Sequence, residues 1–163
     1  MEILTFVEIP KNSKLKFEFD EKLGGIKLDR ALHGPNYFPF EYGFVKETLG
    51  KDGDPLDVVL LSSQATFPGC LVTARPIGML EMEDEAGIDD KILAVPLEKI
   101  DPRFGEIKEL SDLSSHQRAE IKEFFETYKR LEPNKWVKLK DFKPRGDAEK
   151  LIEESQKRFK EKE

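Results

Sequence analysis

Residues 52–61 read DGDPLDVVLL, an acidic turn that runs directly into a short, continuous apolar segment. Gly53 permits a tight backbone path, and Pro55 stiffens it. The apolar run at residues 56–61 is typical of a buried strand. Asp57 therefore stands where the strand begins, and a rigid element holds its carboxylate.

Further strands are predicted on both sides of this segment. Residues 3–9 are rich in β-forming side chains, and residues 15–19 alternate apolar with polar side chains, as a half-buried strand does. A turn at Leu23-Gly24-Gly25 leads into residues 26–29, so we expect a hairpin there. Later strands are expected at residues 70–80, bent or bulged at Pro76 and Gly78, and at residues 92–95 and 136–139.

Helices are predicted only near the C-terminus. Ser114 or Ser115 can cap a helix over residues 116–131, and Pro133 ends it. A second helix is expected over residues 148–160. Many short strands followed by two helices indicate an α+β fold, a small closed or nearly closed β-barrel with helices packed outside. The length suits a single domain, residues 1–163.

Charge and cysteine content narrow the class of protein. Acidic side chains number 33 against 27 basic ones, for a net charge of −6, which argues against a nonspecific nucleic-acid binder. The single cysteine, Cys70, cannot form an internal disulfide and is expected to be a buried thiol. The N-terminus lacks a signal-peptide pattern, and no apolar run approaches the roughly 18 residues of a membrane span. We therefore expect a soluble, cytoplasmic protein that binds no membrane.

The acidic turn at residues 52–57 has two interpretations. Three carboxylates in six residues repel one another unless a cation neutralises them, which indicates a metal site. An ordinary acidic surface turn explains the motif equally well when it is taken alone. An EF-hand calcium loop does not, because Leu56 and Asp57 stand where its spacing requires Asp or Asn followed by Gly.

A second acidic cluster favours the metal interpretation. Residues 84–91 read DEAGIDDK and again place carboxylates around a turn between two strands. Carboxylate oxygens suit hard cations such as Mg²⁺. Zinc is not expected, because the two histidines, His33 and His116, are isolated. There is no P-loop or dinucleotide loop, so a phosphate substrate would have to be held by metal ions and cationic side chains.

These motifs resemble those of the family I soluble inorganic pyrophosphatases. The family signature runs Asp, small or polar residue, Asp, Pro, aliphatic residue, Asp, and residues 52–57 match it at every position. The resemblance extends in the family's order from about residue 3 to residue 140, through residues 7–10, 16–18, 28–30, 42–43, 75–78, 84–87, 91, 95–96, 124–129 and 135–137. It implies a five-stranded, OB-like barrel with flanking helices and an active site at the barrel mouth. It also implies hydrolysis of pyrophosphate to two phosphates with several Mg²⁺ ions, and a homo-oligomer with a hexamer as the expected form.

The resemblance assigns roles to individual residues of this chain. Asp54 resembles the general base, with Tyr42 as a catalytic or supporting group. Carboxylates would hold the divalent ions, those of Glu8, Asp52, Asp57, Asp84 and Asp89, with Asp57 shared between two ions. The phosphate groups would be held by Lys16, Arg30, Tyr128 and Lys129. Supporting polar residues of the same cavity are Glu18, Glu85 and Lys91.

Some features leave other interpretations open. Phe38 stands where similar proteins often have a tyrosine, so a hydroxyl is missing there or comes from Tyr37. By position alone, Tyr128 is a core residue on the apolar face of its helix, and Lys129 is a surface lysine. Two other functions compete with pyrophosphate hydrolysis. An oligonucleotide-binding barrel would need a basic groove with exposed aromatic side chains, and a Mg²⁺-dependent phosphatase would act on organic phosphates.

Overall fold

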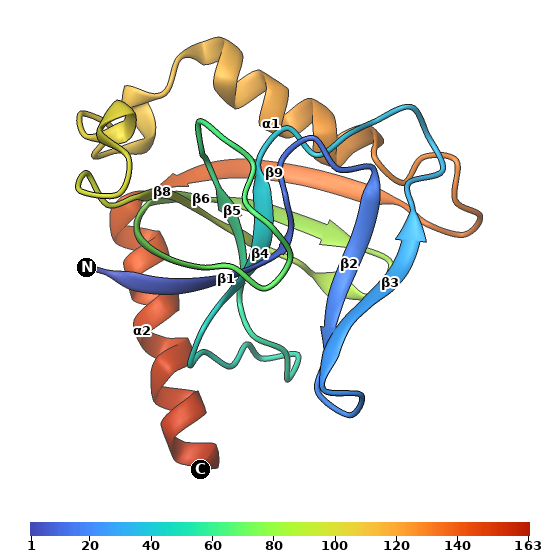
Figure 1. Cartoon of the computed structure of the whole chain (residues 1–163), viewed down its shortest axis with the longest axis horizontal. Helices are drawn as coiled ribbons and strands as arrows, with labels where there is room; N and C mark the ends of the chain where they lie inside the picture. The colour runs from blue at the N-terminus through green and yellow to red at the C-terminus, as the bar shows by residue number, and fades with distance from the viewer.

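The computed structural model describes residues 1–163, and it shows a strongly curled β-sheet with two α-helices packed against it (Figure 1). The helices are α1 (Ser115–Thr127) and α2 (Arg145–Lys162), and two short 3₁₀ turns, Pro102–Phe104 and Leu110–Asp112, precede α1. The strands are β1 (Ile3–Ile9), β2 (Leu15–Asp20), β3 (Gly25–Ala31), β4 (Glu41–Val45), β5 (Asp57–Leu60), β6 (Leu71–Asp84), β7 (Gly87–Ile88), β8 (Lys91–Pro96) and β9 (Val137–Pro144). No helix is long and apolar enough to cross a membrane.

Five of the strands close into a barrel. β1 pairs with β4, β4 with β5, β5 with β8 and β8 with β6, and β6 returns to pair with β1. The β5–β8 pair is parallel, and the other four pairs are antiparallel. β6 is long enough to pair also with β7 and β9. The α+β fold with a five-stranded, OB-like barrel is therefore confirmed.

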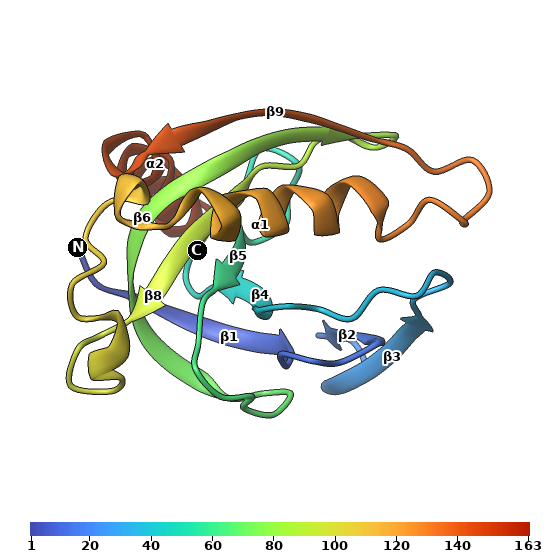
Figure 2. The same ribbon diagram turned by 90° about the horizontal axis from the view of Figure 1, so that it is seen from above.

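The central strands are buried on both faces. Val58 of β5 belongs to an apolar cluster that includes Ile152 of α2, whereas the next residue, Val59, belongs to a cluster that includes Phe125 of α1. Figure 2 shows α1 lying across the sheet and α2 packed at a different side of it. A strand that contributes to two cores must be apolar at every position, which explains the unbroken run that follows the acidic turn.

The β2–β3 hairpin stands outside the barrel as a two-stranded sheet, as the sequence predicts (Figure 1). The backbone N–H of Phe19 donates to the Glu8 carboxylate over 2.8 Å, which ties the hairpin to β1. Because Glu8 is also a predicted metal ligand, this bond connects the hairpin directly to the site described below.

Several element boundaries differ from the predictions. The first helix ends at Thr127 instead of residue 131, because residues 128–132 form short turns in which the N–H of Glu132 bonds to the carbonyl of Lys129. The predicted irregularity in β6 is confirmed as a register shift between Pro76 and Gly78. The strand Glu41–Val45 was not predicted, although it closes the barrel between β1 and β5.

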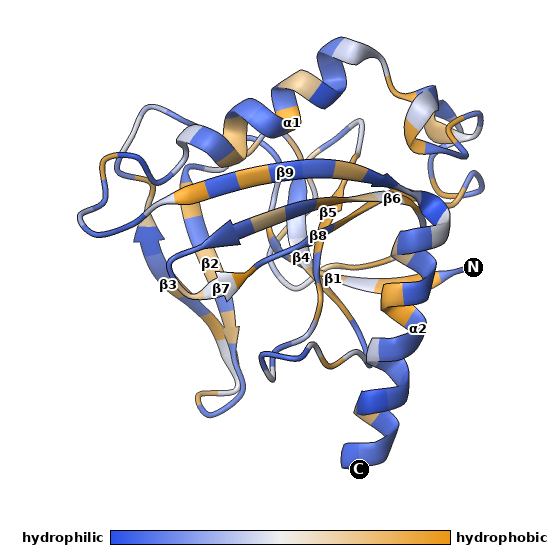
Figure 3. Cartoon of the chain, turned by 180° about the vertical axis from the view of Figure 1, so that it is seen from behind, coloured by the Kyte–Doolittle hydropathy of each residue, from blue (hydrophilic) through white to orange (hydrophobic).

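The last strand is longer than predicted and runs on to Pro144. Its hydropathy alternates along its length (Figure 3), and outward lysines pair with glutamates of β6. Lys140 lies 3.5 Å from Glu83, and Lys143 lies 3.5 Å from Glu81. The lysines make this strand difficult to predict, because the glutamates that pair with them lie in β6, far away in the sequence.

Candidate active site

A cavity of about 1040 Å³ gathers nearly all of the predicted site residues. It lies between the barrel, the β2–β3 hairpin and the segment that follows α1. Thirteen of the fourteen candidates line it, and these are Glu8, Lys16, Glu18, Arg30, Tyr42, Asp54, Asp57, Asp84, Glu85, Asp89, Lys91, Tyr128 and Lys129. The exception is Asp52, which is exposed and does not line the cavity.

The barrel topology explains why distant residues meet. Asp57 is the first residue of β5 and Lys91 is the first residue of β8. Because β5 and β8 are parallel, their first residues lie at the same edge of the sheet. β6 runs antiparallel to β8 and ends at Asp84, which places a further carboxylate at that edge.

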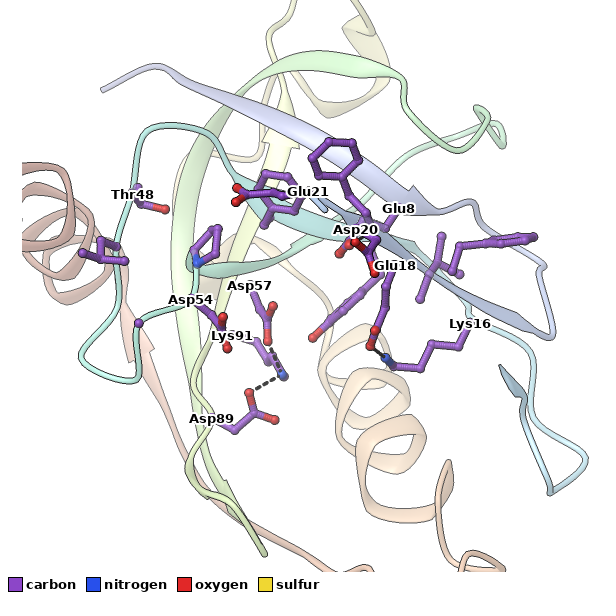
Figure 4. A pocket seen from close by; sticks show the side chains of 18 of the residues that line it. Glu8, Lys16, Glu18, Asp20, Glu21, Thr48, Asp54, Asp57, Asp89 and Lys91 are labelled. Carbon is purple, nitrogen blue, oxygen red and sulfur yellow. Dashed lines mark hydrogen bonds and ion pairs between the residues drawn. The ribbon is translucent and has the colours of Figure 1, made fainter. Parts of the chain in front are cut away.

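Lys91 lies at the centre of the acidic residues. Its Nζ donates to Asp57 Oδ2 and to Asp89 Oδ1, each over 2.7 Å (Figure 4). The ammonium group also lies 5.4 Å from the ring centre of Tyr42. Burial opposes the charged form, yet the two carboxylates raise the pKa of Lys91 well above its usual range. Lys91 is therefore a charged, buried cation that joins two predicted metal ligands.

The predicted ligands differ in their proton affinity. Burial raises the pKa of Glu8 to about 7, against the lowering effect of the Phe19 N–H. Burial also raises the pKa of Asp89 to about 6, and the charge of Asp57 adds to this shift while Lys91 opposes it. Burial acts to raise the pKa of Asp57 too, but Lys91 outweighs it and the pKa is lowered. Of these three carboxylates, Asp57 is the one that its surroundings hold in the ionised form.

Asp54 lies in the loop between β4 and β5 and faces the cavity (Figure 4). Burial raises the pKa of its carboxyl, and the charges of Asp52 and Asp57 raise it further. The Asp52 carboxylate turns back into its own loop, where Oδ1 accepts the N–H of Asp54 over 3.1 Å. A carboxylate of raised pKa is a better proton acceptor, which suits the role predicted for Asp54.

The predicted phosphate-binding cations are all paired with carboxylates. Lys129 lies 3.0 Å from Asp84 and 3.2 Å from Glu85, and it is only 5% exposed. Lys16 lies 2.5 Å from Glu18. Lys129 is therefore a buried residue of the cavity wall, and its interpretation as a surface lysine is wrong.

Arg30 is held by two carboxylates, one of which the sequence did not indicate. Its Nη1 donates to Asp29, its neighbour in the chain. Its Nε lies 2.8 Å from Oε1 of Glu132, a side chain that is 6% exposed. Glu132 follows α1 in a short turn, and no motif distinguishes it from the many exposed glutamates of the chain. Arg30 also lines the cavity, so these two carboxylates fix a cation at its wall.

Aromatic side chains form the wall behind these charges. Tyr128 is 8% exposed, and its ring centre lies 5.2 Å from that of Phe124. It also lines the cavity, so it belongs both to the core and to the cavity wall. Phe38 is buried between Phe124 and Tyr42 and contributes no hydroxyl. Tyr37 is 58% exposed and does not line the cavity, so it does not replace the missing group.

The donor set of the cavity fits hard cations. Ten carboxylate and eight cationic side chains line it, with no histidine or cysteine. No three acidic, histidine or cysteine side chains converge into a complete metal site in this arrangement, because Asp57 and Asp89 are bound to Lys91. A Mg²⁺–oxygen bond is roughly 2.1 Å long, so side-chain rotations would have to bring these oxygens closer together. The all-oxygen chemistry fits Mg²⁺ and excludes the usual zinc ligands.

Comparison with known proteins gives a consistent result. The family model described as inorganic pyrophosphatase matches residues 5–160. The inorganic pyrophosphatase of Nanoarchaeum equitans is 46% identical over 160 residues, which cover 98% of this chain and 99% of that protein. The Helicobacter pylori enzyme is 49% identical over 153 residues, which cover 94% of this chain and 88% of the relative. A solved structure of the Helicobacter pylori pyrophosphatase superimposes with a TM-score of 0.95 at 46% identity, and the match covers 98% of this chain and 94% of that chain. The structure of the Thermus thermophilus pyrophosphatase superimposes with a TM-score of 0.95 at 41% identity, and the match covers 98% of this chain and 91% of that chain.

Proposed function

The chain belongs to the inorganic pyrophosphatase family, and we propose that the cavity described above is the site at which it hydrolyses pyrophosphate to two phosphates. The protein is a metal-dependent hydrolase that acts on a phosphoanhydride bond. One observation carries the assignment of the site. Residues from widely separated segments that share the family's motifs line a single cavity rich in carboxylates and cations. We also treat residues 1–163 as one pyrophosphatase domain.

We assign several Mg²⁺ ions to the carboxylates of the cavity. Asp57, Asp89 and Asp84 lie at one edge of the barrel, and Glu8 faces the same space from β1. Asp52 belongs to this ligand set by resemblance and would join it through a rotation of its side chain. When bound, the ions would lower the pKa of a water molecule and neutralise charge on the phosphates.

Asp54 is proposed as the general base. It lies in the cavity next to the ligand residues, and its raised pKa favours uptake of a proton from the attacking water. Lys16, Arg30, Tyr128 and Lys129 would bind the phosphoryl oxygens and stabilise charge on the leaving phosphate. Tyr42 faces this space from β4. Through their ion pairs, Glu18 would hold Lys16 in position, Glu85 would hold Lys129, and Lys91 would hold Asp57.

Two neighbouring aspartates provide the test. Asp57→Asn removes a shared ligand, so Mg²⁺ binding and turnover should both be lost. Asp54→Asn removes a proton acceptor, so Mg²⁺ should bind nearly normally while the rate falls by roughly 10²–10⁴. Its remaining activity should rise towards alkaline pH, because hydroxide from solvent can replace the base. The measurement is a Mg²⁺ titration by calorimetry together with a pH–rate profile. Full activity of Asp54→Asn with an unchanged profile would remove Asp54 from this role.

Substrate choice separates this proposal from a general phosphatase. Phosphate release should be measured from pyrophosphate, ATP and a simple phosphate monoester under the same Mg²⁺ concentration. Pyrophosphate should be hydrolysed far faster than the other two. An oligonucleotide-binding role is disfavoured, because carboxylates outnumber cations along the cavity. A homo-oligomer, with a hexamer as the expected form, and a cytoplasmic location belong to the same proposal, and light scattering of the purified protein tests the first.

A further inference from the structure

The loop that carries Asp52 and Asp54 rests on the C-terminal helix. This loop joins β4 to β5, and Figure 1 shows one end of it lying against α2. The N–H of Leu49 donates to the carbonyl of Ser155 over 3.0 Å. Nε of Arg158 donates to the carbonyl of Leu49 over 2.9 Å. Both main-chain polar groups of Leu49 are therefore held by α2, three residues before the first aspartate.

Arg158 is itself fixed in this position. Its Nη2 donates to Oγ of Ser155 over 2.8 Å, and Ser155 is completely buried. A guanidinium group is planar, so the two bonds through Nε and Nη2 define its orientation. The next residue, Phe159, lines the active-site cavity, as does Lys162. The helix thus contacts the loop on the side that faces the site.

Beyond Leu49 the loop is held by its own hydrogen bonds. The N–H of Gly50 donates to the carbonyl of Asp54 over 2.7 Å, and the N–H of Gly53 donates to the carbonyl of Gly50. No hydrogen bond of residues 49–55 reaches any part of the fold other than α2. Figure 4 labels Thr48 and Asp54 along this part of the chain.

We propose that Arg158, together with Ser155, is a positioning residue of the active site, which anchors this loop so that Asp52 and Asp54 stay next to Asp57. The proposal rests on the proposed function, because it takes the loop carboxylates to act on Mg²⁺ and water. Groups that orient metal ligands from behind typically contribute about ten- to hundredfold to metal affinity or activity. Neither residue belongs to a site motif, and their effect reaches the site only through the backbone of Leu49.

The test compares two substitutions on the same helix. Arg158→Met keeps much of the side-chain volume and removes both anchoring donors. Ile152→Val changes a completely buried residue of α2 that packs in an apolar cluster and takes part in none of the loop hydrogen bonds. Mg²⁺ affinity is measured by titration calorimetry on the folded protein without substrate, and unfolding temperature is measured in EDTA. We expect Arg158→Met to weaken Mg²⁺ binding about tenfold. Ile152→Val should lower the unfolding temperature and leave Mg²⁺ affinity unchanged.

Further variants keep the result decisive. Arg158→Lys retains a charge that can reach one acceptor, so it should weaken Mg²⁺ binding less than Arg158→Met, and it replaces that variant if the latter does not fold. Unchanged Mg²⁺ affinity in both Arg158 variants, with Asp57→Asn defective, would overturn the anchoring role alone. Unchanged affinity in Asp57→Asn as well would overturn the proposed metal site and this proposal with it. An equal loss of Mg²⁺ affinity in Ile152→Val would show that the Arg158 variants act through the general stability of the fold, and this would overturn the proposal.

Discussion

Replacing Lys91 by Met tests whether one buried ammonium group holds the acidic centre together. Methionine has a similar length, so the main change is the loss of charge between Asp57 and Asp89. Each carboxylate oxygen lies 2.7 Å from Nζ. At an effective dielectric constant of about 20, each pair contributes about 6 kcal/mol before the cost of desolvation is subtracted. The net cost of removing one partner from a buried pair is about 3–5 kcal/mol.

The structure places the expected loss near the lower end of that range. The Lys91 side chain is 2% exposed, but the side chains of Asp57 and Asp89 are 32% and 25% exposed, so water partly solvates them. We expect Lys91→Met to lower the free energy of unfolding by about 3 kcal/mol at pH 8 in EDTA. Part of the loss should disappear at acidic pH, because the Asp89 carboxyl, whose pKa is about 6 beside Lys91 and higher without it, can then take up a proton.

Urea unfolding followed by circular dichroism gives the measurement, at pH 8 and pH 5.5 and with and without Mg²⁺. Lys46→Met is the matched control, because Lys46 lines the same cavity, is exposed and takes part in no ion pair. Mg²⁺ should restore stability to Lys91→Met by supplying the missing positive charge. A loss below about 1 kcal/mol at pH 8, the usual size for an exposed pair, would refute the central role of this ammonium group.

Three further predictions follow from the same charges. Mg²⁺ at a hundredfold excess over its dissociation constant should stabilise the fold by about 2.7 kcal/mol, and Ca²⁺ should stabilise it without supporting comparable turnover. A thermal unfolding curve indifferent to millimolar Mg²⁺ would contradict a metal site. In EDTA, Glu8 should lower the free energy of unfolding by about 3 kcal/mol as the pH rises from about 4.5 to about 7, and Asp89 should add to the fall below about pH 6. The reason is that folded Glu8, with a pKa of about 7, keeps a proton that the unfolded chain releases above 4.5. Glu8→Gln should make this part of the pH profile shallower, and an equally steep profile would show that Glu8 does not cause the fall. Arg30→Met should cost about 3 kcal/mol, because the carboxylate of Glu132 loses its partner at 7% exposure. Adding Glu132→Gln should recover most of that loss in urea unfolding, and a double variant no more stable than Arg30→Met would show that the burial of Glu132 is not the cause.

The strands and turns that the sequence predicts are those whose pattern depends on residues adjacent in the chain. The apolar run of β5 and the glycine turn of the β2–β3 hairpin are local patterns, and both are found at the predicted positions. β4 was missed because its five residues, EYGFV, mix a buried glutamate with a glycine. Glu41 is buried because its carboxylate accepts the N–H groups of Lys11 and Thr66, over 2.6 and 2.5 Å. Those donors lie in two other loops, so no local pattern could reveal the burial.

The same limit applies to the candidate site. Residues that we propose to carry the chemistry through their own side chains, such as Asp54 and Asp57, stand out as an unusual motif. Residues that hold other groups in position do not, since Glu132 and Arg158 resemble ordinary surface charges in a chain with 37% charged residues. Their importance follows from distances of 2.8 and 2.9 Å to groups far away in the sequence, and such distances are set by the fold as a whole.

The pairing of charges in the cavity explains how an acidic protein can bind a highly charged anion. Lys129 is bound to Asp84 and Lys91 to Asp57, so the cations are held in place by the carboxylates that we assign to Mg²⁺. Each divalent ion that binds a carboxylate also weakens the hold of that carboxylate on its lysine, because the two cations compete for the same oxygens. The ammonium group of Lys129, which lines the same cavity, can then turn towards phosphoryl oxygens. Metal binding thus both adds positive charge and frees Lys129, so pyrophosphate should bind weakly in EDTA and far more tightly once the carboxylates are occupied.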